Sequence, residues 1–166
     1  MTEFFIALWF LFWSVGRHED LTFLGVDNGS PLWSCATFSF VHISFIHLLI
    51  NCFGLYSLCR LLRHMKGWVA LMLLASAFLS AYVMQLLGLF SGLTIGGSAM
   101  AFAALGIVTA EYDIKRRVRF YSSVALALFF PLLFPQINGL IHIFAYVFGF
   151  MAGKVYYFFF CLKRWM

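Results

Sequence analysis

The chain has 166 residues, of which 64% are hydrophobic and only 10% are charged. A soluble domain carries about 25% charged residues, so this composition excludes a water-soluble globular protein and predicts helices that lie in lipid. The net charge of +5 does not indicate a nucleic-acid partner. The basic residues cluster in short stretches between apolar runs, a pattern that orients membrane proteins.

Charges and turn residues divide the chain into apolar segments, which we expect to be helices of a single domain over residues 1–166. The segments cover residues 3–16, 42–62, 67–90, 95–110, 118–134 and 138–162. A span needs roughly 20 residues, so the first and fourth are short. The first has no basic n-region and no cleavage site, so we expect a span there rather than a signal peptide. The fold class is therefore an all-α membrane protein with six transmembrane helices.

The distribution of basic residues predicts the orientation. All Lys and Arg residues except Arg17 lie toward the far ends of the second, fourth and sixth segments or directly after them. The connection over residues 17–41 instead carries acidic residues and a further apolar stretch, so we expect it to be extracytoplasmic and partly embedded in the membrane. The positive-inside rule then places both termini in the cytoplasm.

Polar side chains within spans are costly, so each is a functional candidate. The six acidic residues all lie outside the deep parts of the segments, which excludes an aspartyl intramembrane protease. His18-Glu19 lacks the second histidine of a zinc-protease motif, so we expect no metal. The remaining candidates are His42, His47, Asn51, Ser98, Asn138 and His142.

Several of these residues are predicted to lie at one depth. His47 and Ser98 each precede the charge that ends their segment by about 13 residues, or ~20 Å of helix. His142 lies in the first turns of its segment, so all three share a layer in the outer half of the bilayer. Asn51 shares a helix face with His47 at i,i+4. A channel or transporter lining, or polar contacts between helices, would explain the same layer.

The layer contains the groups that acyl transfer requires. Gly96 and Gly97 place Ser98 at a helix start, where backbone N–H groups favour an anion. Ser98 would be the nucleophile and His142 its base, and because no carboxylate is near, the pair would be a dyad rather than a triad.

The same residues resemble sequence motifs of the rhomboid family of intramembrane serine proteases. His42, His47 and Asn51 are similar to the second-helix signature H-x4-H-x3-N. The run Gly96-Gly97-Ser98-Ala99 is similar to the G-x-S-G motif. His142, followed by Gly149 and Gly153, resembles in part the sixth-helix motif. Order and spacing agree over nearly the whole chain.

By this resemblance, Ser98 is the nucleophile and His142 the general base, with an oxyanion hole formed by His47, Asn51 and the Ser98 backbone N–H. The supporting residues would be Gly96, Gly97, Phe102, His42 and Gly149. The substrate would be a transmembrane or juxtamembrane segment of another membrane protein, cut near the outer face beside a small residue without any cofactor. We expect the inner membrane of a bacterium as its location.

Some positions depart from the family pattern. Ala99 replaces a glycine, Phe102 replaces a tyrosine that stacks on the histidine, and Ser34 replaces an arginine of the first loop. We expect these departures to affect the efficiency of catalysis and the structure of the first loop more than the type of reaction, because Ser98 and His142 are both present. Two alternative functions remain: a non-catalytic rhomboid-like protein that binds client helices, and a small transporter or channel.

Overall fold

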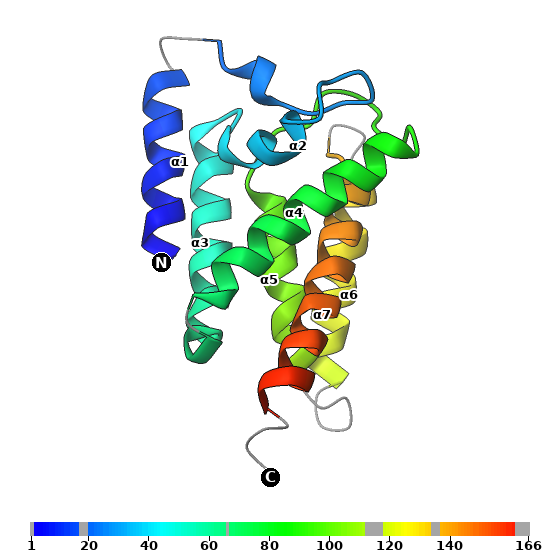
Figure 1. The fold of residues 1–166 in the computed structure, drawn as a ribbon. Helices are drawn as coiled ribbons and strands as arrows, with labels where there is room; N and C mark the ends of the chain where they lie inside the picture. The colour runs from blue at the N-terminus through cyan, green and yellow to red at the C-terminus, as the bar shows by residue number, and fades with distance from the viewer. Residues whose placement is uncertain (1, 17–19, 66, 112–117, 134–136, 162–166) are drawn as a thin grey trace.

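The computed structural model describes residues 2–16, 20–65, 67–111, 118–133 and 137–161. In this part of the chain, the long helices form one bundle, and each runs opposite to the one before it (Figure 1). They are α1 (Thr2–Gly16), α3 (Phe45–Leu61), α4 (Trp68–Leu86), α5 (Ser98–Glu111), α6 (Val118–Phe129) and α7 (Gly139–Cys161). The shorter elements are η1 (Thr22–Leu24), α2 (Ser34–Thr37), η2 (Phe38–Phe40), η3 (Arg63–Met65) and η5 (Phe130–Leu133). The predicted all-helical class is confirmed.

Each predicted segment contains one long helix, but one predicted start was wrong. The second segment was expected to be helical from residue 42, whereas α3 begins only at Phe45. Ser44 has an extended backbone and its hydroxyl accepts a hydrogen bond from the His47 N–H at 3.2 Å, so it acts as the N-cap. The fourth segment contains α5, which begins at Ser98 as Gly96 and Gly97 predicted, after Gly96 at φ +135°.

The helices differ in their ability to cross a bilayer. Among the described residues, α4 and the stretch Gly139–Phe160 of α7 are long and apolar enough to do so. A third span results if Ser34–Phe40 and Phe45–Leu61, which meet at a bend of 98°, are counted as one broken helix. Shorter apolar helices make up the rest. The outer faces carry large exposed apolar side chains, which suits lipid, while the count of six spans and the cytoplasmic termini stay predictions.

Helix α5 lies at the centre of the bundle and packs against α3, α4 and α7. Its contact with α7 depends on glycines. A Cβ atom added to Gly149 would collide with the backbone of Ala103, and one added to Gly106 would collide with the backbone of α7 at Tyr146. At Gly153 an added Cβ would lie 2.8 Å from the Cβ of Ala110. The two backbones therefore nearly touch along this glycine seam, as small residues at a helix interface allow.

The connection before α3 folds over one end of the bundle, at the top of Figure 1. The Ser30 hydroxyl and the Gly29 N–H donate to the Asp27 carboxylate at 2.8 Å each and hold the pKa of Asp27 below its usual range. Gln85, near the end of α4, donates to the carbonyl oxygens of Asp27 and Ser30. The connection is thereby fixed to α4.

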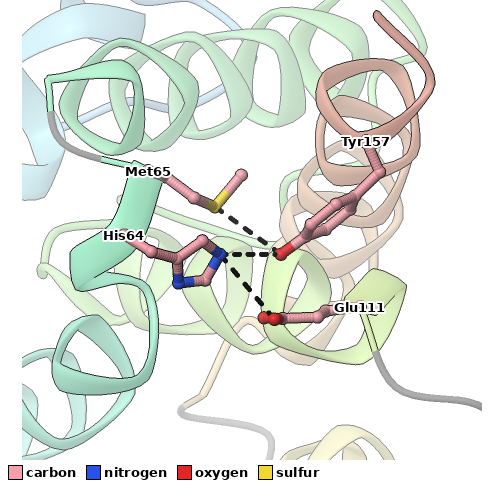
Figure 2. Close-up of polar contacts among 4 residues, drawn as sticks. All are labelled: His64, Met65, Glu111 and Tyr157. Atoms are coloured by element: carbon pink, nitrogen blue, oxygen red, sulfur yellow. Dashed lines mark hydrogen bonds and ion pairs between the residues drawn. The ribbon is translucent and has the colours of Figure 1, made fainter. Parts of the chain in front are cut away.

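Polar contacts join three elements at the other end of the bundle, as Figure 2 shows. The Nε2 atom of His64, in η3, lies 3.2 Å from the Tyr157 hydroxyl on α7 and 3.7 Å from the carboxylate of Glu111, the last residue of α5. The Tyr157 hydroxyl also lies 3.9 Å from the sulfur of Met65. These contacts link the ends of α5 and α7 to the turn between α3 and α4.

Candidate active site

Two polar side chains meet where α5 and α7 begin. Ser98 is the first residue of α5, and His142 lies in the first turn of α7. The His142 Nε2 atom lies 2.9 Å from the Ser98 Oγ atom, a hydrogen-bond distance. His142 is buried at 6% exposure, and its Nδ1 atom has no hydrogen-bond partner among the described residues. The pair therefore has the geometry of a serine–histidine dyad without a carboxylate.

The histidine ring is held from one side by an aromatic face. The Phe102 ring stacks on the His142 ring with a centroid distance of 4.3 Å and an interplanar angle of 10°. Phe102 lies one helical turn after Ser98, so α5 supplies both the serine and the stacking ring. The stack limits rotation of the imidazole and keeps Nε2 directed at the hydroxyl.

The segment before Ser98 requires glycine at two successive positions. Gly96 has φ +135°, which favours glycine, and an added Cβ there would lie 2.5 Å from the His47 ring. A Cβ at Gly97 would collide with the Trp9 ring. The Gly96 N–H donates to the Phe38 carbonyl at 2.9 Å, and the Gly97 N–H donates to His42 Nε2 at 3.2 Å. These contacts fix the loop that presents Ser98.

His42 was expected to lie in the second helix, but it precedes that helix. It lies before α3, is buried at 6% exposure and contacts the Trp9 ring edge-to-face at 5.0 Å between centroids. Its ring also lies 5.3 Å from that of His47. Local sequence did not single out Trp9, although its complete burial on the apolar helix α1 places it against the bundle.

Helix α3 contributes two more polar groups. His47 and Asn51 line the same cavity as Ser98 and His142. Asn51 is 5% exposed, and its Nδ2 atom has no hydrogen-bond partner in the described part of the chain. An unpaired buried N–H group is costly, so this donor is available to an acceptor that enters the cavity.

The cavity has a volume of about 630 Å³ and is lined by both apolar and polar side chains. It lies between α3, the residues before α5 and the start of α7. Thr94 and Asn138 also line the cavity and are hydrogen-bonded to each other at 3.0 Å. The sequence indicated Asn138 as a polar candidate, but it indicated neither Thr94 nor this pairing. Pairing between segments distant in sequence leaves no local pattern that could have indicated it.

Most of the chain, including the dyad, matches the model of a known protein family. The Rhomboid domain model matches residues 29–163, which include Ser98, His142, His47 and Asn51. The chain belongs to the rhomboid family. A comparison with curated proteins finds no match. The membership predicted from the motifs is confirmed, and the rhomboid domain together with the apolar helices indicates an integral membrane protein. The family includes serine proteases and also inactive members.

Proposed function

We propose that this rhomboid is an intramembrane serine endopeptidase with a Ser98–His142 dyad. The observation that carries the proposal is the 2.9 Å distance between His142 Nε2 and Ser98 Oγ, at the wall of a cavity large enough for a peptide segment. A hydroxyl is a weak nucleophile unless a base lies within hydrogen-bond reach. A serine that served only as a helix cap would not need a histidine within hydrogen-bond distance, and that histidine would not need an aromatic ring stacked on its face.

In the proposed reaction, His142 Nε2 removes the proton from Ser98 as Oγ attacks the substrate carbonyl carbon. The resulting imidazolium then gives that proton to the leaving amine, and the peptide bond breaks. A water molecule then attacks the ester carbonyl while His142 takes its proton. The bond between Ser98 Oγ and the acyl carbon breaks, His142 returns the proton to Oγ, and the carboxyl product leaves. No cofactor enters any of these steps.

Negative charge develops on the carbonyl oxygen during the attack. The Asn51 carboxamide is the best-supported donor, because it is buried, it lines the cavity and its Nδ2 atom has no hydrogen-bond partner among the described residues. His47 and the backbone N–H of Ser98 would complete the oxyanion hole. Fixed donors at a site of low dielectric stabilise such a charge better than mobile water does.

The proposed substrates are transmembrane or juxtamembrane segments of other membrane proteins, cut beside a small residue near the outer face. We propose further that all six long helices cross the inner membrane of a bacterium, with both chain ends in the cytoplasm. The arrangement in Figure 1 supports this topology, since α1 begins and α7 ends toward the end of the bundle where Arg60 and Arg63 lie. The connection before α3, which contains Asp20 and Asp27, folds over the other end of the bundle, where Gln85 near the end of α4 binds the Asp27 carbonyl.

A fluorophosphonate probe tests the dyad directly, because it reacts only with an activated serine. The purified wild-type protein in detergent micelles should be labelled, and Ser98→Ala and His142→Ala should not. Ser57→Ala is the matched control, since Ser57 is an exposed serine on α3. In cleavage of a model transmembrane substrate, the wild type and Ser57→Ala should be active, and Ser98→Ala and His142→Ala should be inactive.

The proposal fails if the folded wild-type protein is neither labelled nor active. That outcome favours the alternative of a non-catalytic rhomboid that binds client helices. Labelling that persists in Ser98→Ala would also refute the assignment, because another residue would then be the nucleophile.

A further inference from the structure

One hydrogen bond joins the two segments that lead into the dyad helices. The Asn138 Nδ2 atom donates to the Thr94 Oγ1 atom at 3.0 Å. Thr94 lies four residues before Ser98, and Asn138 lies four residues before His142. Both side chains line the cavity that contains the dyad. The bond therefore connects equivalent positions on the two approaches to the site.

The Thr94 end of this bond is firmly anchored. Its backbone N–H donates to the Val26 carbonyl at 2.8 Å, and its carbonyl accepts from the Val26 N–H at 3.0 Å. Val26 is fully buried. The neighbouring Asn28 exchanges two hydrogen bonds with the backbone of Phe90, at 2.8 and 3.0 Å. Thr94 is thus attached to the loop that covers the bundle, independently of α7.

The Asn138 end belongs to α7, because the helix begins at the next residue, Gly139. Further along, the glycine seam holds α7 against α5, beginning with the contact of Gly149 with Ala103. The dyad lies between these two supports. The seam fixes the helices on the inner side of the dyad, and the Asn138–Thr94 bond fixes them on the outer side.

We propose that Asn138 and Thr94 form a clasp that positions His142 against Ser98, so that both are positioning residues. The inference rests on the proposed function, because it concerns the reactivity of the same dyad. With the clasp intact, the part of α7 that carries His142 is held on one side by the clasp and on the other by the glycine seam. The distance of 2.9 Å between Nε2 and Oγ is then kept. Loss of the clasp leaves this turn free to shift relative to α5, which lowers the fraction of molecules with an activated serine.

The experiment measures the rate constant of fluorophosphonate labelling, because this small probe reports dyad reactivity without a peptide substrate. The variants are Asn138→Ala, Thr94→Val and the double variant. Thr94→Val removes the hydroxyl and keeps the shape of the side chain. Each single variant should slow labelling about five-fold, the equivalent of one hydrogen bond of about 1 kcal/mol. Both single variants lose the Asn138–Thr94 bond, and Thr94→Val also loses the longer hydrogen bond, at 3.4 Å, from the Thr94 hydroxyl to the Gly92 carbonyl. The double variant should therefore be no slower than Thr94→Val alone.

Thr94→Ser provides the rescue, since it restores a hydroxyl and should recover most of the labelling rate. Melting temperatures in detergent are measured in parallel. A purely structural role would lower the melting temperature in proportion to the loss of rate, whereas a positioning role lowers the rate of protein that is still folded at the assay temperature. The KM for a model transmembrane substrate should stay near the wild-type value while kcat falls.

Several outcomes would overturn the clasp. Wild-type labelling rates in both single variants, with none in Ser98→Ala, would refute it and leave the proposed function intact. Unchanged labelling with a raised KM in Asn138→Ala alone would make Asn138 a substrate contact instead. Faster substrate cleavage in both variants would make the bond a gate. If the wild-type protein were not labelled at all, the proposed function would fail and the clasp would fail with it.

Discussion

Gly149→Ala tests whether the glycine seam sets the dyad distance. The substitution adds one methyl group where α7 faces α5. The new Cβ would lie 2.8 Å from the Cα atom of Ala103, and it would also meet the carbonyl oxygen of that residue. Carbon atoms pack favourably at about 3.5–4.0 Å. Because backbone atoms cannot rotate away as a side chain can, the two helices must separate locally by about 1 Å.

The expected loss follows from this displacement. Ser98 lies five residues before Ala103 on α5, and His142 lies seven residues before Gly149 on α7, so the separation reaches both dyad residues. A misplacement of about 1 Å can lower the rate of a catalysed step by about 10²-fold. Overpacking of this kind also destabilises a protein by about 1–3 kcal/mol. We therefore expect cleavage and fluorophosphonate labelling to fall by about two orders of magnitude, with a moderate drop in melting temperature.

Gly67→Ala is the matched control. An added Cβ at Gly67 meets nothing within 4 Å, so the same change in chemistry causes no displacement there. Activity and melting temperature should remain close to the wild-type values. A Gly149→Ala protein that cleaved and labelled at the wild-type rate would show that the spacing of α5 and α7 does not control the dyad, and the reasoning from the seam would be wrong.

Three further predictions concern the site and the topology. Asn51→Ala and His47→Ala should each lower kcat by less than the ~10²–10³-fold typical of a single oxyanion donor, with KM nearly constant; wild-type rates in both would refute the oxyanion assignment. Phe102→Ala should slow labelling several-fold, given that stacking contributes ~0.5–1.5 kcal/mol, and Phe102→Tyr should recover most of it. A membrane-impermeant thiol reagent added outside should label a cysteine introduced at Asp27 but not one at Lys115, and the reverse pattern would contradict the topology.

Much of the site could be predicted because its chemistry contrasts with its surroundings. In a chain with so few polar residues, those that lie within apolar segments are conspicuous, and helix geometry alone gave His47, Ser98 and His142 a common depth. Two glycines before Ser98 predicted a helix start there, and α5 begins at that residue. The start of α3 could not be predicted in this way. The apolar pattern begins before Phe45 and includes His42, and only the capping contact of Ser44 makes the helix start at Phe45.

By itself, the sequence determined that the protein is helical, that it belongs in lipid, and which polar residues its helices carry, because composition, periodicity and motif spacing are local properties of the chain. Only the tertiary structure decided which groups meet. Three contacts join residues more than 40 positions apart: the Trp9 ring packs against Gly97, the Gly97 N–H donates to His42, and Asn138 donates to Thr94. Such contacts depend on how the helices pack, and the packing is set by the close approach of α5 and α7 at their glycines.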